Sequence, residues 1–362
     1  MTRMKILAVM FASSAAAQLL VLNKEGNVAV VDPATQKILG KGPTGDGPHE
    51  VVSTTDGKLA VASNYGTGQA PGHTLSVMDI ATYKEIHRVD LAPQMRPHGL
   101  FAAGGKVYFT CEGTKTVGSY DPAADRVDWV LGTGQDGTHM IALSRDGKVL
   151  FTSNIGSGSM SIFEHTGSPG DWHQNVVKVG RGAEGFDLSP DEKELWAANA
   201  GDGTVSVIDI AARKVAQTFP VDAKRSNRLK FMPDGKRVLI SDLTTGNLLV
   251  IDVASKKEIK RIKVGSGIAG ILVAADGSKA YIGATPDNYV GVVDLKTLEM
   301  KPRIRLFIDS PPSGFEEPEQ VCRVPVLLGL FLPRVRAAVA WPSAGVAVHQ
   351  NFLDPVFARG SR

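Results

Sequence analysis

The sequence has few cysteines, few aromatic residues and little excess charge. Its 362 residues include only two cysteines, Cys111 and Cys322, which are too few for a disulfide framework. The net charge is +3 and the basic residues form no stripe along the chain, so we expect no nucleic-acid partner. Aromatic residues make up 6% of the chain. Three tryptophans fall in or beside expected strands, where we expect packing between structural units: Trp129, Trp172 and Trp196.

Several catalytic and cofactor signatures are also missing. The chain contains no Gly-x-Ser-x-Gly, His-Glu-x-x-His, Gly-Lys-Ser or Cys-x-x-Cys-His segment. This excludes the classes of hydrolase, metalloprotease, phosphate-binding protein and haem protein that these segments identify. No apolar run is long enough to span a bilayer, so no transmembrane segment is expected. An active site assembled from distant parts of the chain stays open.

The first residues have the composition of a secretory leader. Arg3 and Lys5 precede a short apolar run at residues 6–11, and small residues follow up to residue 17. A basic start, a short apolar segment and an Ala-x-Ala ending predict a signal peptide over residues 1–17. The protein is then expected to be periplasmic or secreted in a bacterium. The alternative is an apolar N-terminal strand.

A repeated unit dominates the rest of the chain. Residues 203–217 alternate apolar and small polar residues up to Asp209, as a half-buried strand does, and then turn into a second strand. The same phrase recurs at intervals of 42 to 47 residues with an acidic residue at Asp32, Asp79, Asp121, Glu164, Asp209, Asp252 and Asp294. A period of this length indicates a β-propeller or a solenoid. We expect the acidic residues to anchor turns.

Each repeat resolves into four expected strands. In the copy that begins at Glu184 they are residues 184–189, 193–199, 204–209 and 214–219. The turn between the first two strands is Asp-Gly in four other copies, and Asp-Gly between apolar runs is a strong hairpin signal. The fold class predicted is therefore all-β, a seven-bladed propeller of four-stranded antiparallel blades.

The repeat resembles a known family. Val205-Ser-Val-Ile-Asp-Ile-Ala211, Ser189-Pro-Asp191 and Leu195-Trp-Ala-Ala-Asn199 are similar to the bacterial YVTN-type propeller repeat, within the superfamily of cytochrome d1-like and lactonase-like propellers. The resemblance covers about residues 19–300 and implies a binding platform. Gly47-Pro-His-Glu-Val51 and Ser63-Asn-Tyr-Gly66 resemble segments of seven-bladed lactonases and imply a hydrolase as the alternative.

The C-terminal part departs from the repeat. The propeller is expected over residues 18–300, with its incomplete first blade closed by a strand from the C-terminus, so that no sheet edge stays free. Residues 301–362 instead hold one Lys and seven Arg, against 21 Lys and 11 Arg before them. We interpret this tail as foreign to the fold, from an out-of-frame or fused ending, or as a disordered or docking extension. Residues 337–341 could supply a substitute closing strand.

One position in each repeat is the first candidate site. Aligning the expected innermost strands on their turns brings one residue per blade to the same mouth of the central channel: His49, His98, His139, Glu184, Asn227 and Ala269. Imidazoles and a carboxylate from adjacent blades suit a divalent transition metal, so His49, His98, His139 and Glu184 are candidate metal ligands. The same groups could instead hold an anion, with Arg96, Arg181, Arg225 and Arg228 nearby in the sequence, or a histidine could act as general base on an ester or lactone. The alternative is that they bond only backbone and water.

A second set should rim the same mouth, at the ends of the second strands: Asn23, Asn64, Glu112, Asn154, Asn199, Asp242 and Ala284. Asn and Asp suit turns, so a structural role is favoured over hydrogen bonding to a ligand. Taken together, the sequence predicts an exported, monomeric propeller. It is expected to bind a small molecule, a metal ion or a protein partner at its His/Glu mouth, with a lactonase-like hydrolase as the alternative.

Overall fold

A computed structural model describes residues 18–168, 170–306 and the backbone of 326–331. The predicted signal peptide over residues 1–17, most of the tail and the proposed strand at residues 337–341 lie outside the described residues. Within the described part of the chain, no helix has the length and apolar character needed to cross a membrane.

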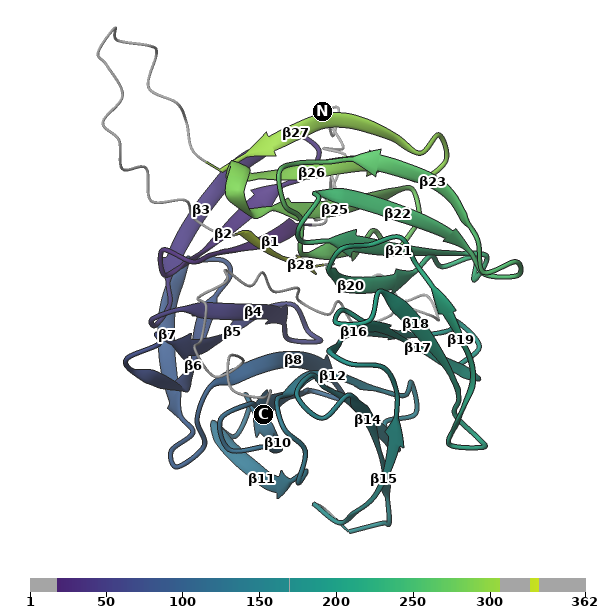
Figure 1. Cartoon of the computed structure of the whole chain (residues 1–362). Coiled ribbons are helices and arrows are strands. Elements are labelled where there is room, and N and C mark those ends of the chain that lie inside the picture. The colour runs from purple at the N-terminus through teal and green to yellow at the C-terminus, as the bar shows by residue number, and fades with distance from the viewer. Residues whose placement is uncertain (1–17, 169, 307–325, 332–362) are drawn as a thin grey trace, which may run out of the picture.

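Seven four-stranded antiparallel sheets are arranged in a ring about a central axis (Figure 1), which confirms the predicted fold class. The innermost strands are β4 (Pro48–Ser53), β8 (Pro97–Ala103), β12 (Thr138–Leu143), β16 (Ala183–Leu188), β20 (Ser226–Phe231) and β24 (Ile271–Val273). The second strands are β1 (Gln18–Asn23), β5 (Leu59–Gly66), β9 (Lys106–Cys111), β13 (Val149–Asn154), β17 (Glu194–Asn199), β21 (Arg237–Asp242) and β25 (Lys279–Ala284).

The remaining strands complete each blade outward from the channel. The third strands are β2 (Asn27–Asp32), β6 (Pro71–Asp79), β10 (Thr116–Asp121), β14 (Ser159–His165), β18 (Thr204–Asp209), β22 (Asn247–Asp252) and β26 (Tyr289–Asp294). The outer strands are β3 (Lys37–Pro43), β7 (Lys84–Asp90), β11 (Arg126–Gly132), β15 (Trp172–Lys178), β19 (Lys214–Pro220), β23 (Glu258–Lys263) and β27 (Glu299–Arg305). One 3₁₀ turn, η1 (Thr285–Asp287), precedes β26.

The repeated acidic residues hold the turns between third and outer strands, as predicted. Asp252 accepts hydrogen bonds from the backbone N–H and the hydroxyl of Ser255, at 2.8 and 2.6 Å. Five other copies accept backbone N–H groups in the same way: Asp32, Asp79, Asp121, Asp209 and Asp294. Glu164 differs, because its carboxylate pairs with Arg213 instead. These carboxylates therefore shape the blades and lie away from the channel.

The tryptophans pack between blades, also as predicted. The rings of Trp129 and Trp172, from neighbouring blades, have centroids 5.7 Å apart. Trp196 contacts Phe219 in its own blade and Phe231 in the next, with centroids 5.4 and 5.3 Å apart. Aromatic pairs at these distances add to the burial of apolar area, and they hold these blades against their neighbours.

The first sheet contains β28 (Val326–Phe331), antiparallel to β1. This strand falls within the single apolar stretch of the tail, not at residues 337–341. The outer strand of the last blade, β27, continues past residue 300 to Arg305. Closure of the ring by the two chain ends stays a prediction.

Candidate functional site

The candidate residues lie on β-bulges of the innermost strands. In β4, Pro48 pairs with Asn64 and Val51 pairs with Ala62, so His49 and Glu50 together face the single residue Ser63. The same irregularity occurs in β8, β12, β16 and β20, where it contains His98, His139, Glu184 and Asn227. A bulge redirects side chains without ending the strand, which is how one position per blade comes to face the channel.

A hydroxyl on the second strand holds the bulge in four of the five blades that have one, at Ser63, Thr110, Ser153 and Ser241. The N–H of Glu50 donates to Ser63 Oγ at 3.0 Å, and that hydroxyl donates to the carbonyl oxygen of His98 in the next blade at 2.8 Å. Thr110 and Ser153 make the same two bonds one and two blades further on. The histidines are therefore positioned by hydrogen bonds that cross from blade to blade.

Next to these bulges, glycine allows close approach of the strands. A Cβ on Gly99 would clash with the carbonyl oxygen of His139, and a Cβ on Gly185 would clash with that of Asn227. The inner ends of neighbouring blades thus lie backbone against backbone, which draws the side chains at the candidate position together.

His98 and His139 form the centre of the site with Glu112. Both histidines are fully buried, and their rings lie 3.9 Å apart. Nδ1 of His139 is hydrogen bonded to a carboxylate oxygen of Glu112, and Tyr65 donates its hydroxyl to the other oxygen at 2.5 Å. Burial, with the neighbouring Glu112 carboxylate, raises the pKa of Tyr65 above its usual range, so the phenol stays a proton donor.

His49 lies beside this centre and has a different environment. Its ring stacks on Tyr65 with centroids 4.2 Å apart and lies edge-on to His98 at 5.1 Å. Nδ1 is 2.6 Å from the carbonyl oxygen of Gly47, and the Lys24 ammonium is 2.7 Å from the same nitrogen. Burial, above all, lowers the pKa of Lys24 well below its usual range.

Glu184 belongs to a separate polar group across the channel. One carboxylate oxygen of Glu184 accepts the amide of Asn227, and Nη1 of Arg228 is 3.9 Å from that oxygen. Nη2 of Arg228 donates to Glu50 at 2.9 Å, although the two residues belong to blades that are not adjacent. Arg228 is 2% exposed and Glu50 is fully buried, so a desolvated ion pair spans the channel below the histidines.

The predicted rim residues use their polar groups within their own blades. Asn64 binds Thr74 and Ser76, Asn154 binds Ser159 and Ser161, and Asn199 binds Thr204 and Ser206, all through their amide nitrogens. Asp242 accepts four backbone N–H groups. Glu112 is the exception, because its side chain turns into the channel mouth and is 12% exposed there.

The structure therefore groups the sequence candidates differently from the prediction. Among the described residues, His98, His139 and Glu112 have donor atoms within 4.8 Å of one another. Glu112 takes the place expected for Glu184, and His49 is held beside the group by Lys24 and Tyr65. Sequence reasoning missed Lys24, Tyr65 and Glu50. Glu50 and Tyr65 lie within the two short segments, residues 47–51 and 63–66, that resemble lactonases, and this resemblance was the available signal.

The comparisons with known proteins agree with the fold. Hydrazine synthase of Kuenenia stuttgartiensis superposes with a TM-score of 0.67 at 20% identity, over 76% of this chain and 92% of that chain. A putative 6-phosphogluconolactonase of Bacteroides fragilis gives 0.65 at 15%, over 80% and 94%. The dihydro-heme d1 dehydrogenase NirN in complex with DHE gives 0.56 at 14%, over 79% and 72%. At these identities the likeness shows the fold alone.

Sequence comparison gives the family. No curated protein matches the sequence significantly. Residues 97–278 match the model of the YNCE-like β-propellers, and this segment is half of the chain. The resemblance seen in the repeat is thereby confirmed, and the chain belongs to the YNCE-like β-propeller family.

Proposed function

We propose that this propeller binds a divalent transition-metal ion at His98, His139 and Glu112 and presents it to a small ligand at the channel mouth. The observation that carries the proposal is the convergence of two imidazoles and one carboxylate, from two neighbouring blades, within 4.8 Å. Two histidines and a carboxylate suit zinc and iron, and three protein ligands leave coordination positions open for a ligand or water.

The surroundings of the three residues support this use. The metal would replace the proton that His139 and Glu112 share, and Tyr65 would keep its hydrogen bond to the other Glu112 oxygen. Because these two hydrogen bonds already fix the orientation of the Glu112 carboxylate, little entropy is lost when an ion binds. The exposed edge of Glu112 provides the side from which an ion enters.

The test is a calorimetric titration of zinc into untagged protein that has been treated with a chelator. We expect one ion per chain, and loss of tight binding in His98→Ala and Glu112→Gln. His173→Ala is the matched control, because His173 is an exposed histidine on an outer strand. Binding should also weaken as pH falls, since protons compete for the imidazoles.

Two results would contradict the proposal. One is zinc affinity that is the same in His98→Ala and His173→Ala, which would place the bound ion elsewhere. The other is a wild-type protein that takes up no zinc, manganese, iron or copper in stoichiometric amount.

Hydrolysis is the second candidate function, and the Glu112–His139 pair favours it. A carboxylate bonded to Nδ1 fixes an imidazole so that the second nitrogen can take a proton from water. One of the similar structures is named a putative 6-phosphogluconolactonase, so a lactone is the first substrate class to assay. Turnover of a chromogenic lactone by metal-free protein, lost in His139→Gln, would support hydrolysis without a metal.

A further inference from the structure

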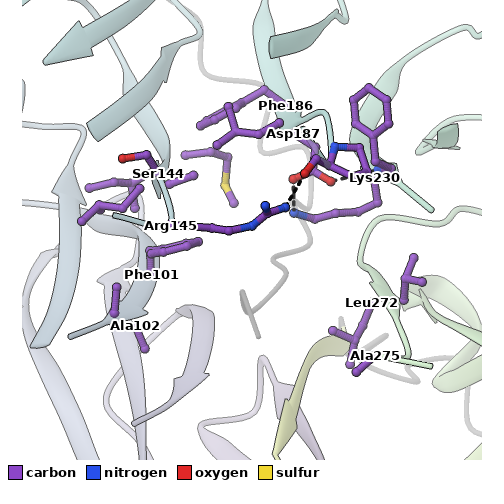
Figure 2. A pocket seen from close by; sticks show the side chains of 18 of the residues that line it. Phe101, Ala102, Ser144, Arg145, Phe186, Asp187, Lys230, Leu272 and Ala275 are labelled. Carbon is purple, nitrogen blue, oxygen red and sulfur yellow. Dashed lines mark hydrogen bonds and ion pairs between the residues drawn. The ribbon is translucent and has the colours of Figure 1, made fainter. Parts of the chain in front are cut away.

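The opposite end of the channel opens into a cavity of about 640 Å³ (Figure 2). It is lined by the second halves of the innermost strands and by the turns that follow them. The histidines are the second residues of β4, β8 and β12, so the two regions occupy opposite ends of one channel. A volume of this size falls in the range of cavities that bind small organic molecules.

The strand register determines which side chains line this cavity. In five of the inner strands, the residue three positions after the histidine position lines the cavity. These residues are Phe101, Ala142, Asp187, Lys230 and Leu272. Phe101 and Leu272 are 7% and 6% exposed, whereas their strand neighbours Leu100 and Ile271 are fully buried. The small remaining exposure of these two apolar side chains is therefore directed into the cavity. Met140 and Phe186 add further apolar surface to its wall.

One side of the cavity carries cationic groups. Figure 2 shows Arg145 extending from one blade toward Asp187 and Lys230 on the next two blades. Asp187 is already used, because it accepts the Phe231 N–H at 2.9 Å and the Lys230 ammonium at 3.3 Å. Lys230 has three ammonium hydrogens, and Asp187 is its only hydrogen-bond partner among the described residues. Lys230 thus has ammonium hydrogens to spare at this side of the cavity. Arg145 adds positive charge there, although its guanidinium already donates to the Pro190 carbonyl and its Nε lies 3.8 Å from a Glu192 carboxylate oxygen.

We propose that this cavity is a second binding site, for a small organic anion with an apolar body and a terminal carboxylate or sulfonate. The apolar part would lie against Phe101, Phe186 and Leu272, and the acidic group would accept a hydrogen bond from Lys230, with the positive charge of Arg145 beside it. Charge-assisted bonds at the edge of an apolar wall favour a ligand in which one end is acidic and the other is not. The site is separate from the histidine end and does not depend on a metal there.

The test uses the full chain and the dye anilinonaphthalene sulfonate, which has an apolar body and one sulfonate. We expect saturable fluorescence with one site per chain. Decanoate should compete with the dye and decanol should not, because only the acid offers the charged acceptor. Lys230→Gln should weaken dye binding about tenfold. The matched control is Lys260→Gln, on the exposed outer strand β23, which should leave binding unchanged.

Two further variants keep the test decisive if Lys230→Gln folds poorly. Asp187→Asn keeps an acceptor for the Phe231 N–H and removes the competing charge, so dye affinity should rise. Ala142→Phe should occupy part of the cavity beside its apolar wall and weaken binding. Equal competition by decanol and decanoate, equal affinities in Lys230→Gln and Lys260→Gln, or no gain in Asp187→Asn would overturn the proposal.

Discussion

The two ends of the channel are built from the same strands and have opposite character. At one end the bulges place buried polar groups together: three histidines, with Glu112 and Tyr65 beside them. Three residues further along, the same strands present Phe101, Leu272 and Lys230 to an open cavity. Between the two ends, Arg228 and Glu50 form an ion pair across the channel. The comparison shows that two positions of the same inner strand can differ in polarity, although the blade around them is the same.

The largest expected effect is at the ion pair that divides the two ends. Glu50→Gln should lower the free energy of unfolding by about 3–5 kcal/mol, because it leaves Arg228 buried with its main partner neutralised. Glu50→Gln combined with Arg228→Met should cost less than the single change. Urea unfolding measures both, and Glu85→Gln in the exposed pair with Arg88 is the control. A double variant less stable than Glu50→Gln would contradict this account.

The next effect is a pH dependence of stability that we expect from Lys24 at the histidine end. Burial lowers the pKa of Lys24 in the folded protein, so the unfolded chain binds more protons in the interval between the folded and unfolded pKa values. Wild-type stability should therefore rise with pH through that interval, up to about 10.5, relative to Lys24→Met. Thermal unfolding of the two proteins at several pH values gives the difference. A difference that is constant with pH would show that Lys24 keeps an ordinary pKa.

A smaller effect concerns the hydroxyls that hold the bulges. Ser153→Ala removes the partner of the Met140 N–H and the Glu184 carbonyl, and should cost about 1–3 kcal/mol. Of the five blades that have the bulge, one lacks this device, because Ala198 faces its bulge. Ala198→Ser should offer the same hydroxyl to Gly185 and Asn227 and stabilise by about 0.5–1.5 kcal/mol. If both changes destabilise equally, tight packing outweighs hydrogen bonding at this position.

The smallest effect is the one expected between the two proposed ligands. Because the Arg228–Glu50 pair is buried and lies between the sites, zinc at the histidine end should change dye affinity at the cavity end less than twofold. Dye titrations with and without saturating zinc measure this coupling. A change of tenfold or more would mean that the ion pair transmits the occupation of one end to the other.

Much of the candidate site could be read from the sequence, since it follows from register. The turns and acidic residues repeat with the blade, so counting back from a turn selects His49, His98 and His139 correctly as neighbours. The bulges themselves were not predicted. Their signal is the Ser or Thr near the end of the second strand, as Ser63 before Asn64 and Ser153 before Asn154.

The sequence by itself determined the blade, its four strands, its turns and the position that faces the channel. Each of these depends on contacts within one repeat or with the next, and a periodic sequence encodes such contacts directly. Only the tertiary structure decided that Glu112 joins His98 and His139, that Glu184 turns to Asn227, and that Arg228 reaches Glu50. Those pairings depend on the direction of side chains on a bulge and on the distance across the ring, which no single repeat specifies.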